Sequence, residues 1–206
     1  MKTISTKADE TLAEIVVTAL DIAMAEGIAQ VSFGKVAKRL GMSKSGVFCR
    51  AGSLHSLQRA VLDEYDRRFL SDVVAPTRAA PRGLPALEEH VRKLALRASG
   101  AAMGASCLYI AGAFDGAALD AALHQRLQHG LARWRGLLGQ LVQDAVELGQ
   151  LPPDTNCDQL IFEIHSLVVG MAHDARFLRD ESIGQRMVLA CRRLLASYTQ
   201  TPVTLQ

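Results

Sequence analysis

Helical periodicity is the feature of this sequence that most restricts its fold. Apolar residues recur at steps of three and four along almost the whole chain, beginning with Leu12, Ile15, Val16 and Ala19, as they do on one face of an α-helix. No stretch alternates apolar and polar residues for long enough to predict a strand, and no repeat of 20–50 residues is present. The pattern predicts an all-α fold.

Glycines, prolines and capping residues divide this pattern into helices. The first helix ends at Gly27, and a long helix begins at Ser53 and runs to about residue 74. Residues 75–85 hold three prolines and one glycine, which predicts a linker. We therefore expect a small N-terminal unit over residues 1–52, a connecting helix over 53–74, the linker, and a helical bundle over 86–206. The bundle helices are predicted at 87–99, 105–114, 119–148, 158–178 and 182–198.

Composition excludes several classes of protein. With 206 residues, 49% of them hydrophobic and 21% charged, the chain can bury a core and is not intrinsically disordered. The first residues mix acidic and basic side chains and do not form a secretory signal. The uncharged stretch 98–114 has only 17 residues and contains glycine and serine, so it predicts a buried helical hairpin rather than a membrane span. We expect a cytoplasmic protein.

The sequence predicts no metal, no cofactor and no enzymatic activity. The four cysteines are 34 to 58 residues apart, too far for a zinc ribbon or a redox motif. His124 and His129 are five residues apart, so a helix turns them away from each other. No pair of catalytic acids and no phosphate-binding loop is present.

The segment over residues 32–51, SFGKVAKRLGMSKSGVFCRA, predicts a helix-turn-helix. Ser32 and Ser43 are N-cap residues for two short helices, and Gly41 between them can take the positive φ that ends the first helix. The second helix ends near Gly52. Many helix pairs share such a turn, so the spacing by itself is only moderately specific.

Basic residues gather around this motif. Between Gly27 and Leu62 the chain has no acidic residue and six basic ones, whereas the remaining 170 residues carry 17 basic and 21 acidic groups. Such segregation is typical of a surface that binds the phosphates of nucleic acid. A solvated basic face would also contain these charges, but it does not explain why they surround a helix-turn-helix. The six are Lys35, Lys38, Arg39, Lys44, Arg50 and Arg59.

With these residues in view, the chain resembles the tetracycline-repressor (TetR) family of bacterial transcription regulators. The resemblance covers residues 11–69 and is carried by AEG at 25–27, VSFGKVAKRLGMSKSGVF at 31–48 and SLHSLQRAVLDEY at 53–65. It implies a recognition helix at residues 44–50 that enters the major groove of double-stranded operator DNA. It also implies a homodimer, and a C-terminal domain that binds a small molecule and releases the DNA. An apolar or amphipathic effector is expected, because residues 98–114 carry no charge.

Three positions depart from the family pattern. The family usually has an aromatic residue at Ala51, a tyrosine at Phe48 and a lysine near Leu54 and His55. Phe48 lacks the hydroxyl that often contacts a phosphate. Cys49 suggests a redox switch, but no other cysteine is near it in the sequence, which favours a small side chain facing the groove. The residues expected at the DNA are Ser32, Phe33, Lys35, Ser43, Lys44, Ser45, Gly46, Phe48, Cys49, Arg50 and His55.

Two further sets of residues are expected in the C-terminal bundle. The large side chains on helices that line the effector cavity in the family are Tyr65, Phe69, Tyr109, Phe114, Trp134, Phe162 and His165, for each of which core packing is the alternative. The last two helices, which form the dimer interface in the family, carry the apolar residues Ile164, Val168, Met171, Met187, Cys191 and Leu194. Burial of both stripes within one chain is the alternative.

A second function class competes with the regulator. The departures at Ala51 and Leu54 are also expected of a small-molecule-binding helical protein whose helix-turn-helix contacts another protein. Binding to duplex DNA that weakens steeply with salt distinguishes the two, because only a DNA-binding protein releases counterions from phosphates.

Overall fold

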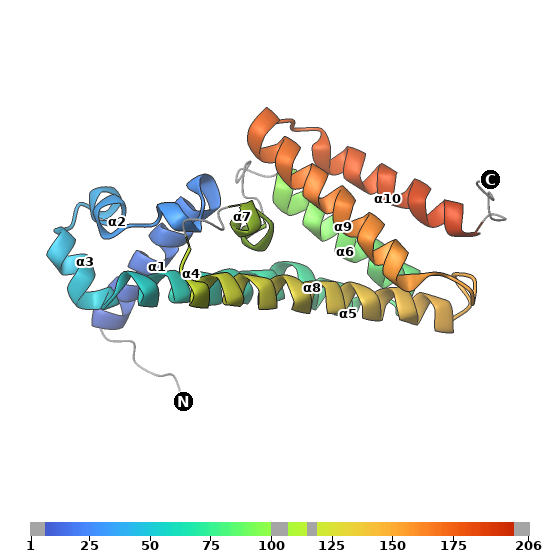
Figure 1. Ribbon diagram of the computed structural model, residues 1–206, viewed down its shortest axis with the longest axis horizontal. Helices are drawn as coiled ribbons and strands as arrows, with labels where there is room; N and C mark the ends of the chain where they lie inside the picture. Colours follow the sequence, from blue (N-terminus) through green and yellow to red (C-terminus); the bar gives the residue numbers. More distant parts are fainter. Residues whose placement is uncertain (1–6, 100–106, 115–118, 200–206) are drawn as a thin grey trace. The chain divides into compact units, whose positions relative to one another are not determined.

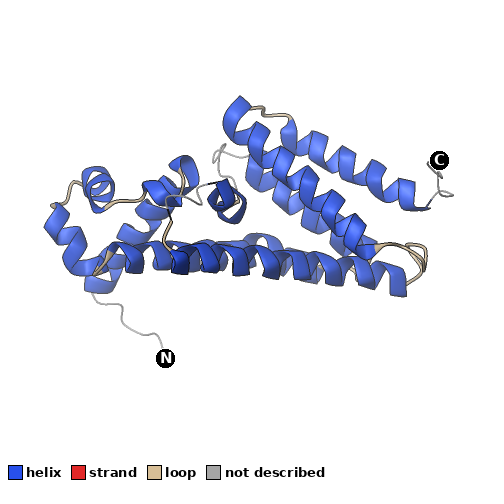
Figure 2. Cartoon of the chain, in the orientation of Figure 1, coloured by secondary structure: helices blue, strands red, loops and turns tan. Residues whose placement is uncertain are grey.

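The computed structural model describes residues 7–99, 107–114 and 119–199, and this part of the chain is helical, with no strand (Figures 1 and 2). The predicted all-α fold is confirmed. None of the described helices is long and apolar enough to cross a membrane. The elements are α1 (Lys7–Glu26), η1 (Ile28–Gln30), α2 (Phe33–Leu40), α3 (Lys44–Ala51), α4 (Leu54–Phe69), η2 (Leu70–Val74), α5 (Ala75–Ala79), α6 (Leu84–Ser99), α7 (Leu108–Phe114), α8 (Ala121–Glu147), α9 (Cys157–His173), η4 (Asp174–Leu178) and α10 (Ile183–Thr199).

The chain divides into two compact units. The first comprises residues 1–68 and 107–128, and the second comprises residues 69–106 and 129–206. The boundary predicted after residue 52 therefore differs from the observed division, because α4, α7 and the start of α8 belong with the N-terminal helices. Local sequence patterns do not reveal such an association between distant segments.

The first unit has a core of aliphatic side chains from α1 to α4. Ile15 and Ile22 of α1, Val36 of α2, Val47 of α3 and Val61 of α4 are all completely buried. Burial of apolar surface of this kind is the main favourable contribution to folding. The predicted helices of α1 to α3 are confirmed to within a few residues at their ends.

A polar cluster accounts for the place of α7 and α8 in this unit. The Tyr109 hydroxyl of α7 donates to the Asp66 carboxylate of α4. Arg126 of α8 donates to Asp66 at 2.6 Å and to Asp63 at 3.3 Å. The Tyr65 ring packs edge-on against Tyr109, with 5.4 Å between centroids. These half-buried, charge-assisted bonds tie three helices that are far apart in sequence.

The predicted linker over residues 75–85 is wrong for its first half. The chain continues from α4 through a π-helical turn, η2, into α5, with Pro76 in the first turn of α5. Proline has no N–H to donate inside a helix, and a π-turn is one way in which a helix accommodates such an interruption. The Thr77 hydroxyl donates to the carbonyl oxygen of Val73 at 2.7 Å. The chain turns only after α5, where Gly83 has φ +94°.

A buried histidine connects three helices of the second unit. The Trp134 indole N–H of α8 donates to Nε2 of His90 on α6 at 3.0 Å. Nδ1 of His90 lies 3.1 Å from the Thr77 hydroxyl, which is already a donor to Val73, so Nδ1 carries the hydrogen and donates. Because His90 is completely buried, desolvation lowers its pKa to about 4. The imidazole is therefore neutral and fully hydrogen-bonded.

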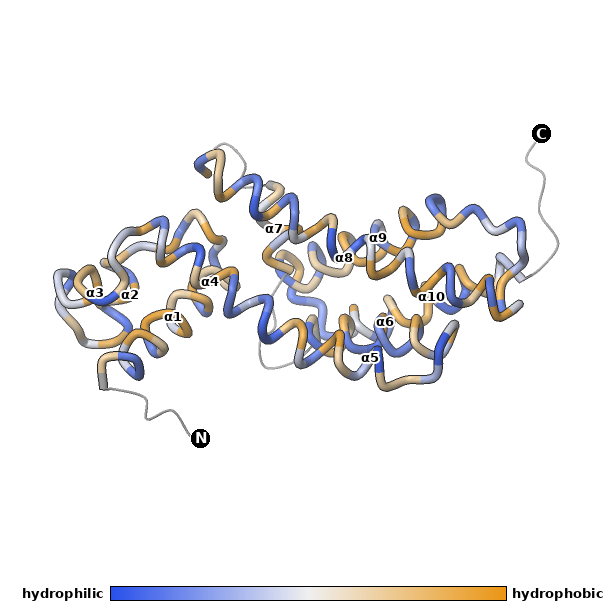
Figure 3. The backbone as a smooth tube through the Cα atoms, turned by 90° about the horizontal axis from the view of Figure 1, so that it is seen from below, coloured by the Kyte–Doolittle hydropathy of each residue, from blue (hydrophilic) through white to orange (hydrophobic). Residues whose placement is uncertain are grey.

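The same unit buries the residues expected at a dimer interface. Ile164, Val168 and Met171 of α9 and Met187 and Cys191 of α10 are each at most 5% exposed, and Leu194 is half-buried. Figure 3 shows apolar and polar residues alternating along these helices, as expected for one buried and one exposed face. Side chains buried within one chain cannot meet a second copy, so the prediction is wrong for these five buried residues, for which core packing is the correct interpretation.

We predict that His90 makes stability depend on pH. The unfolded state takes up a proton near pH 6.5, whereas the folded state resists protonation down to about pH 4. The contribution of His90 to the free energy of unfolding is therefore fully present above pH 6.5. It is lost as the pH falls to 4, which lowers stability by about 3 kcal/mol. Chemical denaturation at several pH values should show a loss that is larger by this amount in the wild type than in His90→Gln. His129→Gln, an exposed control on α8, should follow the wild type. Parallel profiles for all three proteins contradict the prediction.

Candidate nucleic-acid interface

The turn between α2 and α3 is set by a glycine and two serines. Gly41 has φ +64°, and the amide of Met42 donates to the carbonyl of Ala37 at 3.0 Å, which closes α2. The Ser32 side chain accepts from the Lys35 amide at 3.3 Å, and the Ser43 side chain accepts from the Gly46 amide at 3.0 Å. Both serines are therefore N-caps, as the sequence predicted.

One face of α3 is buried and the other is exposed. Val47 is completely buried and holds α3 against the core of the first unit. A side chain at Gly46 would place its Cβ only 3.1 Å from the Ser43 hydroxyl, so the small residue protects the cap. The exposed face presents Lys44, Ser45, Phe48, Cys49 and Arg50. This face combines positive charge with small and apolar groups, as an element that enters a DNA groove requires.

The expected DNA residue Lys35 is bound within the protein. Its ammonium group contacts the Glu26 carboxylate at 2.8 Å and the side-chain oxygen of Gln30 at 3.1 Å. Arg39 approaches the same carboxylate at 3.3 Å. The hydrogen bond from Lys35 lowers the pKa of Glu26. Glu26 precedes the basic segment by one position, so the sequence pattern does not reveal that it pairs with Lys35 and Arg39.

The remaining cations near α3 are exposed. They make no ion pair with any described residue. These groups lie in the segment from α2 to α4, so α3 is flanked by basic residues on both sides along the chain. They are Lys38, Lys44, Arg50 and Arg59.

His55, another expected DNA residue, is paired with an acid. Its Nδ1 lies 3.1 Å from the Asp120 carboxylate. Asp120 also accepts from the Leu123 amide at 2.8 Å and thereby caps α8. The hydrogen bond from the Leu123 amide is the main cause that lowers the pKa of Asp120, and His55 is a smaller one. His55 is therefore held at the start of α8, where it adds a contact between α4 and α8 within the first unit.

The residues expected at an effector pocket gather in more than one place. Phe69 and Trp134 contact the buried His90, with 6.4 Å between the ring centroids of Phe69 and His90. His165 packs against Trp134, with 5.5 Å between their centroids. Tyr65 and Tyr109 contact each other in the first unit. Phe162 is 56% exposed, and the side chain of Phe114 lies outside the described residues. His90 is not among the expected residues, because its position in a helical segment gives no distinctive signal in the sequence.

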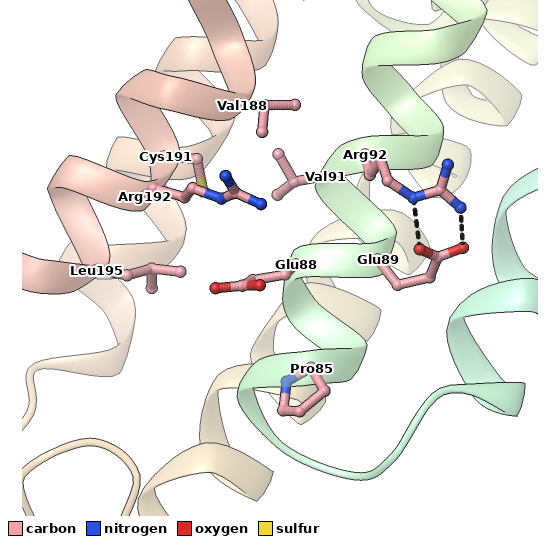
Figure 4. A pocket seen from close by; sticks show the side chains of 9 residues that line it. All are labelled: Pro85, Glu88, Glu89, Val91, Arg92, Val188, Cys191, Arg192 and Leu195. Carbon is pink, nitrogen blue, oxygen red and sulfur yellow. Dashed lines mark hydrogen bonds and ion pairs between the residues drawn. The ribbon is translucent and has the colours of Figure 1, made fainter. Parts of the chain in front are cut away.

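A groove of about 190 Å³ lies between α6 and α10 (Figure 4). Figure 4 shows Glu88 extending from α6 toward α10 and Arg192 extending from α10 toward α6. Burial and the nearby Glu88 raise the pKa of the Cys191 thiol to about 11, so this cysteine is not an activated nucleophile. None of the residues expected at the pocket lines the groove. The other lining residues are Pro85, Glu89, Val91, Arg92, Val188 and Leu195.

The C-terminal part of the chain matches a known protein family. Residues 83–191 match the family model described as "Tetracyclin repressor-like, C-terminal domain". No curated protein sequence matches the chain significantly.

Solved structures share the fold at low identity. A TetR transcriptional regulator from Chloroflexus aurantiacus is 19% identical, with a TM-score of 0.80, over 94% of this chain and 96% of that chain. A TetR-family regulator from Cytophaga hutchinsonii is 15% identical, with a TM-score of 0.76, over 95% and 98% of the chains. A cysteine mutant of the TetR-family regulator CifR, complexed with 26-bp operator DNA, is 16% identical, with a TM-score of 0.71, over 96% and 100%.

We predict that Lys44→Ala and Arg50→Ala each weaken DNA binding and leave the fold intact, because both side chains are exposed. Loss of a phosphate contact should weaken binding to all sequences and reduce the salt slope by about one, whereas loss of a base contact should cost roughly 1–3 kcal/mol at one position. Fluorescence anisotropy at several salt concentrations measures both effects. Arg135→Ala, an exposed control on α8, should bind as the wild type does. Wild-type binding by both variants contradicts the role of α3.

We also predict that Glu26→Gln strengthens DNA binding. The substitution frees Lys35 and Arg39 for phosphates and removes a negative charge beside them. Two additional phosphate contacts would steepen the logarithmic salt slope by up to about 1.8. Glu14→Gln removes the same charge from an exposed position on α1 and serves as the control. Equal slopes for the two variants would show that Glu26 does not restrain these cations.

Proposed function

Since the chain belongs to the tetracycline-repressor family of transcription regulators, we propose that it is a homodimeric repressor released from its operator by a small apolar or amphipathic effector. Members of this family are DNA-binding transcription factors and not enzymes. The described residues contain no group of three or more histidine, cysteine or acidic side chains arranged to hold a metal ion.

The exposed face of α3 is the single observation that supports DNA binding most strongly. Lys44 and Arg50 lie at its two ends, and the side chains of Ser45 and Cys49 between them are small. Small side chains let a helix backbone approach base edges, and flanking cations neutralise phosphates. The N-cap at Ser43 fixes where this face begins.

Selection of genomic fragments, followed by titration over a salt series, tests the proposed function. A repressor should enrich particular fragments and lose about 10³–10⁵ in affinity between about 50 and 200 mM salt if six to ten phosphates are contacted. A helix-turn-helix that contacts a protein instead should enrich no fragment and bind DNA weakly at any salt. Transcription from an enriched promoter, measured with and without the protein, then separates repression from activation.

Exposed apolar side chains on α9 and α10 support the homodimer. Phe162 of α9 is 56% exposed, and Ser166 and Gly170 follow it at four-residue steps on the same face. A Cβ added at Gly170 would meet no atom within 4 Å, so a second helix has room to approach there. Leu189 of α10 is 51% exposed. A two-fold axis beside these helices would pair them as a four-helix bundle.

We predict that Phe162→Glu gives a folded monomer, because the charge lies on the exposed face. Ile164→Glu should instead unfold the chain, because position 164 is completely buried and the new carboxylate would lose its contact with water. Light scattering reports the mass, and circular dichroism reports the fold. A dimeric Phe162→Glu protein, or a wild type that is monomeric at micromolar concentration, contradicts this interface.

The second unit supports an amphipathic effector. The groove between α6 and α10 has an apolar wall formed by Val91, Val188 and Leu195 and a charged rim that includes Glu88 and Arg192. Trp134 is the only tryptophan of the chain and donates to His90, which is next to Val91 on α6. Its fluorescence should therefore change when a ligand moves α6. Candidate effectors that alter this fluorescence should also release the selected DNA.

A further inference from the structure

Phe48 is a large apolar side chain on the exposed face of α3. It is 54% exposed, whereas its neighbour Val47 is completely buried. Its ring meets Phe33 edge-on, with 5.7 Å between centroids and 90° between ring planes. Such a contact limits the positions that the ring can take. The protein therefore exposes a fixed phenyl group one helical turn after Lys44.

The chemistry of a phenyl ring limits what it can recognise at DNA. It has no hydrogen-bond donor, so Phe48 cannot bond to a phosphate, and it cannot read the donor and acceptor pattern of a base edge. The apolar group that base pairs offer in the major groove is the C5-methyl group of thymine. Ser45 and Cys49 beside it are small, so they leave the ring access to the groove.

We propose that Phe48 determines specificity by contacting a thymine methyl group in each half-site of the operator. The inference depends on the proposed function, since it requires α3 to enter the major groove. It assigns sequence recognition to an apolar contact, while Lys44 and Arg50 contribute charge at the two ends of α3. Phe48 is 54% exposed beside Phe33, so part of its surface is available for this contact.

Replacement of thymine by deoxyuridine, which removes only the methyl group, tests the inference. The full-length protein first selects duplexes from a random pool. Each selected duplex is then resynthesised in a series, and each member of the series carries deoxyuridine at one thymine position, in both half-sites. For the position that Phe48 contacts, the wild type should bind the deoxyuridine duplex more weakly than the thymine duplex. The expected loss is about fourfold for each half-site changed, the value for one buried methyl group. Phe48→Ala should bind the thymine and deoxyuridine duplexes equally.

Two control variants separate recognition from structure. Lys44→Ala should weaken binding to both duplexes and keep the wild-type ratio between them. Phe48→Leu retains an apolar side chain and should keep part of the discrimination, and it serves in place of Phe48→Ala if that variant does not fold.

The outcomes distinguish this inference from the proposed function. A wild type that selects no DNA sequence contradicts the proposed function and with it the role of Phe48. A wild type that selects a sequence, but is insensitive to deoxyuridine at every position, overturns the inference alone. The same holds if the wild-type ratio persists in both Phe48→Ala and Phe48→Leu.

Discussion

The turn at Gly41 and Ser43 is the constraint on which the candidate interface depends. Gly41 takes a backbone conformation that side chains disfavour, and Ser43 satisfies an amide at the start of α3 that would otherwise lack a partner. Together they determine where α2 ends and α3 begins. Since Val47 must then face the core, Lys44, Phe48 and the other exposed residues of α3 have no alternative direction.

Charge at this interface is restrained as well as concentrated. Glu26 is at the C-terminal end of α1, where the helix dipole disfavours a carboxylate, and its two cationic partners offset that cost. Lys35 and Arg39 must exchange these contacts for phosphates before they add to DNA affinity. The exposed cations Lys44 and Arg50 therefore contribute differently from the restrained pair, Lys35 and Arg39, to DNA binding and to its salt dependence.

The second unit is organised around a polar group in an apolar interior. His90 bonds to Trp134 and Thr77, and Thr77 in turn satisfies a carbonyl beside the π-turn and Pro76. Buried polar groups stabilise a structure only when all their partners are present. This network thus links the interruption of the long helix to α6 and α8, and the three aromatic residues expected at a pocket collect around it.

The sequence alone determined the helices of the helix-turn-helix, α1 to α3, and the caps at Ser32 and Ser43, because caps and helical periodicity depend on residues within four positions of one another. Tertiary structure decided which of these helices pack together and which residues they pair. Only the folded chain shows that Ile164 is core while Phe162 is exposed, that Glu26 binds Lys35, and that α7 joins the first unit. An apolar stripe predicts that a face is buried, but the partner that buries it is chosen by the packing of helices distant in sequence.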